Sequence, residues 1–469
     1  MPSKRHKDMA LRQDFISLAA RYMLRILFFT LVLFIAHPSF SDTGRWAATY
    51  GGYNIDWAES IQQTSDGGYV VGGYYKSYSV SSPFVEGWGN WVLKLGPNGT
   101  VEWQKAFGGV GVESVQQTND GGYVATGARW YFGDEGEVID LLWVLKLGHD
   151  GTVEWQATYG GVKSGRSNSI KQTLDGGYIV TGWTDSFGAG DEDIWVLKLR
   201  ADASVEWQKT YGGVNKDEAK SIQQTDDGGY IVAGWTRSFG AGESDFWVLK
   251  LAFDGTVEWQ KTYGGNDFES AGSIQQTKER GYIVAGGTSS SGAGESDFWV
   301  LKLSADGTVE WQKTYGGDRY DKAHSIQQTG DGGYIAAGVT RSFGAGDENL
   351  WVLKLEPDGT VEWQKSYGGA EWDAAESVQQ TGDGGYVVAG KTASFNRYSK
   401  TIDLWVLKLS PDGSICPSCN FVMDTSASGT DSNATILQTN ATVRDSNARL
   451  LALPIQVMIP DVSANILCP

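Results

Sequence analysis

The sequence predicts an all-β fold, a seven-bladed β-propeller in which each blade is a four-stranded antiparallel sheet. Three observations predict it: a segment of about 50 residues that recurs seven times, two hairpin patterns in each copy, and one missing strand whose pattern reappears before the first copy. The motif WVLKL begins at steps of 52 residues, with one final step of 54, at Trp91, Trp143, Trp195, Trp247, Trp299, Trp351 and Trp405. A period of this length is typical of repeat architectures.

Each repeat contains two hairpins, whose strands we call A to D in chain order. In the fourth repeat SIQQT (221–225, strand A) and YIVAGWT (230–236, strand B) flank a turn with paired glycines, which tolerate the positive φ values of tight turns. WVLKL (247–251, strand C) is followed by an Asp-Gly turn and by TVEWQKTY (256–263, strand D). Strands B and C are apolar on both faces, so we expect central strands in a sheet that packs against other sheets.

The strand count predicts how the ring closes. Seven A, B and C strands are accompanied by only six D strands of the EWQ type, marked by Trp103, Trp155, Trp207, Trp259, Trp311 and Trp363. Residues 45–52 have the same Trp, the aromatic residue four positions later and the glycine pair. We therefore expect the amino-terminal strand to complete the last blade, which removes the exposed sheet edges that an open array would leave.

The chain divides into three predicted parts: a signal peptide at 1–41, the propeller at 42–413 and a carboxy-terminal tail at 414–469. Six Lys and Arg precede the apolar run 26–36, which is too short to span a bilayer, and small residues suit cleavage before Asp42. An uncleaved signal-anchor is the alternative. We expect a mature chain without a membrane span that is secreted or held at the cell surface or in the periplasm.

The tail differs in composition from the repeats. Its Ser/Thr/Asn-rich part predicts a linker or stalk, and two sequons begin at Asn433 and Asn440. The apolar segment 450–460 is too short for a membrane anchor, which leaves docking on the propeller or a sorting signal. The three cysteines are disulfide candidates, with Cys416 paired to Cys419, or Cys468 paired to one of them.

The net charge of the protein restricts the classes of partner that it can bind. The net charge of −18 argues against nucleic acid and anionic membrane surfaces, and leaves cations, neutral glycans and basic proteins. The acidity also keeps a tryptophan-rich surface soluble. We expect a monomer.

The motifs SIQQTxDGGYIVAGxT, SFGAGxxDxWVLKL and DGTVEWQKTYGG resemble the repeats of secreted bacterial and archaeal cell-surface β-propellers of the quinoprotein-like or kelch-like kind. This resemblance covers residues 45 to about 413 and implies a propeller in an extracellular setting. The C–D turn is also similar to the tryptophan-docking motif of pyrroloquinoline-quinone propellers and to the Asp-box of sialidases. Neither similarity brings cofactor ligands or an arginine triad with it.

We expect function on the face that carries the B–C and D–A loops, because A–B and C–D are tight turns. Acidic B–C loops make Ca²⁺ a candidate ligand, with Asp191, Asp193, Glu243, Asp245, Glu295 and Asp297 as candidate metal residues; the alternative is that they are solvated loop residues. Aromatic residues on this side of the first four blades are candidates for binding a glycan or a protein: Tyr74, Tyr75, Trp130, Tyr131, Trp183 and Trp235. Packing between blades is the alternative for these rings.

No catalytic motif is present. His149 and His324 are the histidines of the repeats, and the sequence pairs neither of them, nor Asp321 or Glu376, with a second catalytic group. The sequence therefore favours a non-catalytic module that binds a protein or a glycan, with no cofactor apart from the Ca²⁺ candidate. The competing interpretation is an extracellular carbohydrate-active enzyme or a quinoprotein-type dehydrogenase.

Overall fold

The computed structural model describes residues 44–52, 54–77, 87–133, 136–396 and 401–415. In the tail it describes residues 419, 421–427, 429–432, 435–438, 442–445, 449–451, 457–458 and 464–468. The predicted signal peptide lies outside the described residues. Within them, no helix is long and apolar enough to cross a membrane.

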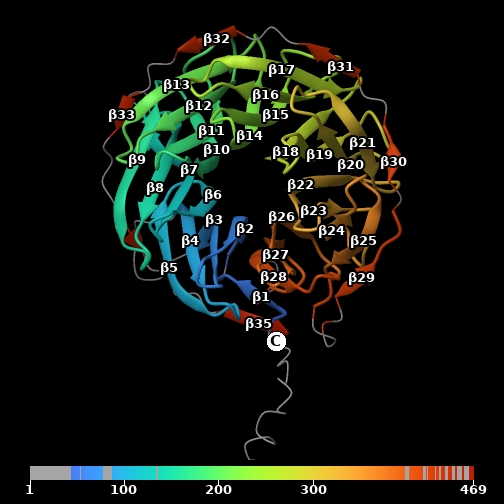
Figure 1. Ribbon diagram of the computed structural model, residues 1–469. Helices are drawn as coiled ribbons and strands as arrows, with labels where there is room; N and C mark the ends of the chain where they lie inside the picture. Colours follow the sequence, from blue (N-terminus) through green and yellow to red (C-terminus); the bar gives the residue numbers. More distant parts are fainter. Residues whose placement is uncertain are drawn as a thin grey trace, which may run out of the picture. The chain divides into compact units, whose positions relative to one another are not determined.

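Seven antiparallel blades form a ring, with the A strands nearest the central channel (Figure 1). The A strands are β2 (Asp56–Gln63), β6 (Gly111–Gln117), β10 (Gly165–Gln172), β14 (Asp217–Gln224), β18 (Glu269–Gln276), β22 (Asp321–Gln328) and β26 (Asp373–Gln380). The B strands are β3 (Tyr69–Ser77), β7 (Tyr123–Phe132), β11 (Tyr178–Thr184), β15 (Tyr230–Thr236), β19 (Tyr282–Thr288), β23 (Tyr334–Thr340) and β27 (Tyr386–Thr392).

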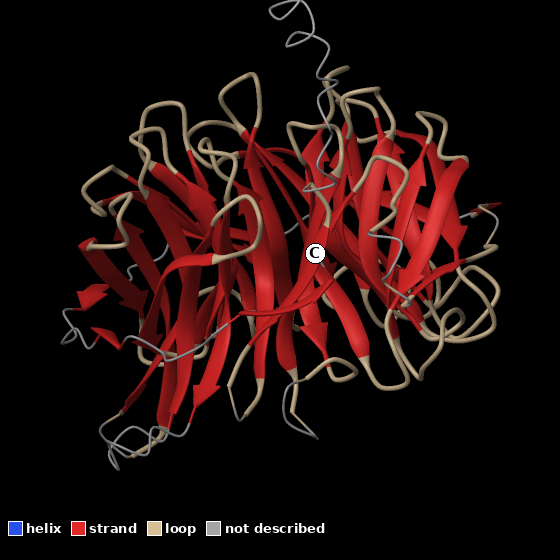
Figure 2. Cartoon of the chain, turned by 90° about the horizontal axis from the view of Figure 1, so that it is seen from below, coloured by secondary structure: helices blue, strands red, loops and turns tan. Residues whose placement is uncertain are grey.

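The C strands are β4 (Gly87–Leu95), β8 (Val138–Leu147), β12 (Asp193–Leu199), β16 (Asp245–Leu251), β20 (Asp297–Leu303), β24 (Asn349–Leu355) and β28 (Asp403–Leu409). The D strands are β5 (Val101–Gly108), β9 (Val153–Gly160), β13 (Val205–Gly212), β17 (Val257–Gly264), β21 (Val309–Tyr315), β25 (Val361–Tyr367) and β1 (Trp46–Tyr50). Figure 2 shows the connecting loops gathered at the two ends of the ring.

The predicted closure of the ring is confirmed. Strand β1 pairs antiparallel with β28, in a register that runs from Trp46 opposite Lys408 to Tyr50 opposite Leu404. The Trp46 and Tyr50 side chains are buried in a cluster that joins the last blade to the first. The chain thus completes its seventh four-stranded blade with its own amino-terminal strand.

The repeated tryptophan of strand C packs between blades. Trp247 is fully buried against Ile194 and Val196 of the preceding blade, and the other six tryptophans of this position are equally buried. Burying a large aromatic side chain in this way supplies much of the hydrophobic free energy of folding. The repetition of WVLKL follows from this shared packing role.

The D-strand motif and the Asp-Gly turn also join neighbouring blades. The Trp259 Nε1 donates to the Ala305 carbonyl at 3.1 Å, and the Tyr263 hydroxyl donates to the Gly307 carbonyl at 2.7 Å. Gly307 has φ of +77°, and a Cβ there would lie 2.9 Å from the Trp259 ring, so glycine suits the position for two reasons. These residues are therefore structural.

The tail adds a fifth strand to the outer edge of every blade (Figure 1). Its strands run around the ring from the sixth blade back to the first and end on the seventh: β29 (Val422–Asp424), β30 (Thr430–Asp431), β31 (Thr435–Gln438), β32 (Thr442–Asp445), β33 (Arg449–Leu451), β34 (Val457–Met458) and β35 (Ala464–Cys468). This differs from the linker or stalk that the composition predicts. The outer D strands offer unpaired backbone groups, which pair with a strand whatever its side chains.

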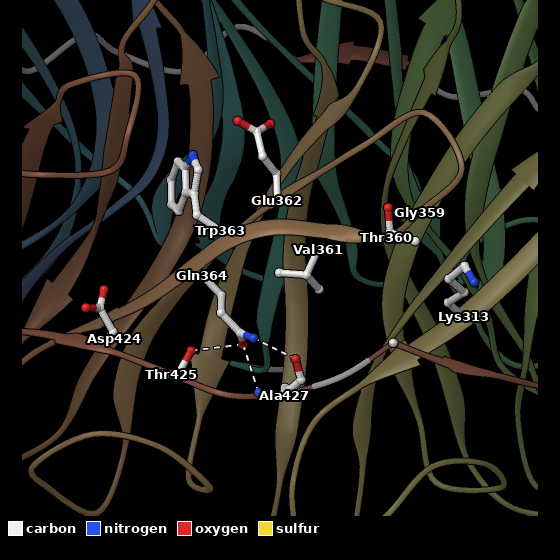
Figure 3. Close-up of a pocket in the computed structure, with 11 residues that line it drawn as sticks. Lys313, Gly359, Thr360, Val361, Glu362, Trp363, Gln364, Asp424, Thr425 and Ala427 are labelled. Carbon is white, nitrogen blue, oxygen red and sulfur yellow. Dashed lines mark hydrogen bonds between the residues drawn. The ribbon is translucent and has the colours of Figure 1, made fainter.

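Side chains of the D strands help to seat the tail. Gln364 Nε2 donates to the Ala427 carbonyl at 2.6 Å, and Gln364 Oε1 accepts from the Thr425 hydroxyl at 2.9 Å (Figure 3). Cys419, which precedes β29, is disulfide-bonded. Cys416 lies outside the described residues, as does the side chain of Cys468.

Candidate functional site

One position of strand A changes its chemistry from blade to blade where the strand meets the channel. Each A strand has a β-bulge just before its Ser, and the extra residue of the bulge is the one that changes. We call these seven positions the mouth residues: Glu59, Glu113, Asn168, Lys220, Gly272, His324 and Glu376. They lie on the side of the channel nearest the D–A loops, because strand A runs from that loop to the A–B turn.

Three glutamates make one side of the mouth acidic. Glu376 binds His324 Nδ1 at 2.8 Å and Lys391 Nζ at 2.6 Å. Burial by itself raises the pKa of Glu376, but the charges of His324 and Lys391 and their hydrogen bonds outweigh it and lower the pKa to about 2. Glu376 is therefore a firmly ionised carboxylate.

The pKa values of Glu59 and Glu113 shift in the opposite direction. Burial raises the pKa of both carboxyls. The charges of Glu376 and Glu113 raise the pKa of Glu59 further, against a smaller lowering by Lys391. For Glu113 the charges of Lys220 and Arg166 lower the pKa and those of Glu376 and Glu218 raise it, and burial outweighs them. Glu59 accepts a hydrogen bond from Trp57 Nε1 at 2.5 Å. Within the described residues, Glu113 has neither a hydrogen bond nor an ion pair. The cations near Glu59 and Glu113 act on them at a distance, and among the described residues neither carboxyl forms an ion pair.

The other side of the mouth is basic. Lys220 binds Glu218 at 2.5 Å, and Arg166 binds Asp140 at 2.5 Å. Burial, followed by the charge of Lys220, lowers the pKa of Lys322. Glu113 also interacts with the charges of Lys220 and Arg166, which places groups of different blades within electrostatic reach of one another.

The predicted aromatic residues are distributed over several environments. Tyr74 is only 1% exposed and stacks on Trp57, with centroids 4.2 Å apart, so this ring packs between blades instead of facing a ligand. Tyr75 packs against Trp91. Trp183 and Trp235 are half-buried.

Two exposed aromatic rings lie together at the end of β7. Trp130 is 40% exposed and makes an edge contact with Phe132, which is 63% exposed. The side chain of Tyr131 lies outside the described residues. Among the predicted aromatic residues whose side chains the structure describes, Trp130 is therefore the exposed one.

The predicted metal residues divide into two groups. Asp191, Glu243 and Glu295 are exposed in the B–C loops. Asp193, Asp245 and Asp297 are buried at the start of strand C and face the first residue of the next blade's A strand, which is Asp217, Glu269 and Asp321, respectively. No group of three or more Asp, Glu, His or Cys that could hold a metal occurs in the part of the chain that the structure describes. Ca²⁺ binding stays a prediction.

The buried carboxylates form pairs across the blade junctions. Burial and the charge of Glu269 raise the pKa of Asp245 to about 6, and burial and the charge of Asp321 raise that of Asp297 to about 6. Burial raises the pKa of Asp56 to about 7, with a further contribution from the charge of Asp403. These pairs weaken the blade junctions when both carboxyls are ionised.

A cavity of about 580 Å³ lies on the outer rim, beside the tail (Figure 3). Its lining includes Lys313, Trp363, Gln364 and Asp424. Asp424 pairs with Lys365 at 2.6 Å, and the Gln364 amide is bonded to the tail. The polar groups here hold the tail, so the channel mouth is the stronger candidate for a functional site.

Sequence reasoning missed the mouth residues. The sequence does not pair His324 with Glu376, and the differences between repeats on which the predicted sites rest lie in strand B and the B–C loops. The signal was available: the residue before Ser in SIQQT changes between acid, base, amide and glycine from blade to blade. The fold of a repeated blade does not require such variation at this position, so the variation is a signal of function.

A family model described as a domain of unknown function (DUF5122) beta-propeller matches residues 281–310. No curated protein matches the sequence.

Solved propellers are similar at low identity. The WD40 beta propeller domain of Doa1 is 11% identical, with 78% of this chain and 97% of that chain covered and a TM-score of 0.45. Sqt1 from Chaetomium thermophilum is 11% identical, with 82% and 90% covered and a TM-score of 0.41. A chain of the COPII outer coat vertex on membranes is 10% identical, with 86% and 100% covered and a TM-score of 0.43. The seven blades make the chain a β-propeller, and the family match falls within the fifth of them.

Proposed function

We propose that the protein is an exported, monomeric and non-catalytic binding module that receives a cationic side chain of a partner protein in the channel mouth. The observation that carries the proposal is the pair Glu59 and Glu113, two half-buried carboxyls of the mouth that form no ion pair among the described residues and whose pKa values are raised chiefly by burial. Export rests on the signal sequence predicted at 1–41. The monomer rests on a closed ring whose outer strands pair with the tail.

A Lys or Arg side chain fits the chemistry of these two carboxyls. Two charges about 4 Å apart attract each other by several kcal/mol at the effective dielectric constant of a protein surface. A ligand cation between Glu59 and Glu113 offsets their mutual repulsion, and it gives Glu113 the partner that it lacks among the described residues. The net charge of −18 accelerates the approach of a basic partner.

The basic side of the mouth orients the bound partner. Lys220 and Arg166, which pair with Glu218 and Asp140, are within electrostatic reach of Glu113, so they attract a carboxylate next to the cationic residue of the partner. Recognition of a charged pair favours a peptide or protein surface over a neutral glycan. The enzyme interpretation is not favoured, since His149 is exposed in a C–D turn at the other end of the blades and His324 is held by Glu376.

The test is a library of short peptides in which one position is Lys, Arg, Gln or Glu. The proposal predicts selection of Lys or Arg, and at least a tenfold loss of affinity in the double variant Glu59→Gln, Glu113→Gln. The control is Glu243→Gln with Glu295→Gln, which removes the same charge from exposed loops of the same face. Equal losses in both double variants would show that net charge, and not the mouth, selects the peptide.

A glycan is the second candidate ligand, favoured by the exposed rings of Trp130 and Phe132. Aromatic rings stack on the apolar faces of sugars. A glycan array probed with the purified protein and with Trp130→Ala tests this candidate. Binding that disappears in Trp130→Ala and persists in the Glu59/Glu113 variant would assign recognition to the end of β7.

A further inference from the structure

We propose that the channel holds a second site, below the mouth, which binds a small oxyanion such as phosphate, sulfate or a carboxylate through Lys171 and a ring of glutamine amides. The site is distinct from the mouth residues and does not depend on the proposed partner. It is built from the third residue of the SIQQT motif, which is glutamine in six blades and lysine in the third.

The six glutamines share one geometry. Each side-chain oxygen accepts a hydrogen bond from a backbone N–H in the A strand of the next blade. The bonds join Gln62 Oε1 to Gln117 N (2.6 Å), Gln116 Oε1 to Gln172 N (2.8 Å), Gln223 Oε1 to Gln276 N (2.8 Å), Gln275 Oε1 to Gln328 N (2.6 Å), Gln327 Oε1 to Gln380 N (2.8 Å) and Gln379 Oε1 to Gln63 N (2.6 Å).

These bonds fix the direction of each amide. A backbone N–H only donates, so the atom that faces it must be the carbonyl oxygen of the glutamine. The NH₂ group is then left over, and among the described residues none of the six NH₂ groups has a hydrogen-bond partner. All six glutamines line the channel cavity, which measures about 290 Å³. The channel is therefore lined by hydrogen-bond donors.

Lys171 interrupts this ring with a positive charge. Its ammonium group cannot accept from the Gln224 N–H, which would be the equivalent bond. Within the described part of the chain, Lys171 has no hydrogen bond or ion pair. Burial lowers the pKa of Lys171, and no neighbouring carboxylate offsets this effect.

The lining of the cavity favours an anion over a cation. Lys171 is the one ionisable residue among those that line it; the others are glutamines, serines and aliphatic residues. An oxyanion would give Lys171 the opposite charge and would accept hydrogen bonds from the glutamine NH₂ groups. A cation would meet the ammonium group and a ring of donors, both of which repel it.

A second hollow, of about 310 Å³, provides a route to the site. Lys171 lines it together with Leu174 and residues of the neighbouring A–B turns, so it opens toward the tight-turn end of the blades. Asp226 also lines this hollow and is its one carboxylate. Anions therefore have a route to Lys171 that avoids the acidic mouth.

The residue found at this position in the other six blades provides the variant that tests the proposal. Lys171→Gln installs the residue of the other six blades, restores an acceptor for the Gln224 N–H and removes the charge. We expect this variant to fold and to be at least as stable as the native protein. Lys163→Gln, on an exposed loop of the same blade, is the control with the same change of charge.

The measurement is isothermal titration of the full-length protein with sulfate and, separately, with phosphate and acetate at constant ionic strength. The proposal predicts one saturable site for at least one of these anions in the native protein and in Lys163→Gln, and at least a tenfold weaker one in Lys171→Gln. A crystal soaked with selenate should show an anomalous peak beside Lys171 Nζ. Equal affinity in all three proteins, no saturable binding of any probe, or a selenate peak elsewhere would overturn the proposal.

Discussion

The substitution Asp297→Asn should stabilise the protein at neutral pH. Asp297 is 1% exposed at the start of β20 and is close to Asp321 of the next blade, and its pKa is raised from 3.8 to about 6. A carboxyl whose pKa is higher in the folded chain than in the unfolded chain destabilises the fold when it ionises. The free energy of unfolding therefore falls as the pH rises through about 4 to 6. Asn349 occupies the same position in the next blade, which shows that an amide fits there.

The magnitude follows from the pKa difference. Ionising Asp297 at pH 7.5 costs about 3 kcal/mol relative to the unfolded chain, and at pH 4.5 this cost falls to about 1 kcal/mol. Burying the amide costs about 1 kcal/mol in the variant at either pH. We therefore expect Asp297→Asn to raise the free energy of unfolding by about 2 kcal/mol at pH 7.5 and to leave it nearly unchanged at pH 4.5.

Urea denaturation followed by tryptophan fluorescence at the two pH values measures both quantities. Asp318→Asn, on the exposed D–A loop of the same junction, is the control and should change the free energy of unfolding by less than about 0.5 kcal/mol at either pH. A variant that is destabilised at pH 7.5, or equally stabilised at both pH values, would refute the reasoning about the carboxylate pair.

One deletion and two substitutions test the scaffold. Deleting residues 45–52 removes β1 and should lower the melting temperature in calorimetry by more than about 10 °C, since two buried aromatic side chains and a complete strand are lost; an unchanged melting temperature would contradict the closure. Ala203 has φ of +67°, so Ala203→Gly should stabilise by about 1 kcal/mol in urea denaturation, and a loss of stability would argue against backbone strain there. Tyr263→Phe should lower the free energy of unfolding by about 1 kcal/mol through the lost bond to Gly307, while an unchanged value would mean that this bond contributes nothing.

The fold could be predicted because the same residue types occupy the same packing positions in every blade. The buried tryptophan of strand C and the turn glycines recur at the period of the blade, and the displaced strand at 45–52 reveals the closure. The strands of the tail could not be predicted, because they are two to five residues long and are held by backbone pairing with the D strands. Such pairing leaves no hydrophobic alternation in the sequence.

The site could be predicted only in part. Sequence reasoning located function on the loop-bearing face, but it assigned Asp193, Asp245 and Asp297 to solvent-facing loops, whereas they begin buried strands. The sequence alone also does not show that Glu59, Glu113 and the other mouth residues lie close together, because they are far apart in the chain. Their proximity depends on ring closure and on the bulge that turns each of these residues toward the channel.

A crystal structure of the protein with its best-selected basic peptide tests the central claim most directly. The account predicts that a Lys Nζ or an Arg guanidinium of the peptide lies within hydrogen-bonding distance of both Glu59 and Glu113. It also predicts that a carboxylate of the peptide, where one is present, is turned toward Lys220. A peptide bound at the tight-turn end of the blades, along the tail, or at the mouth with its cationic group in solvent would contradict the account.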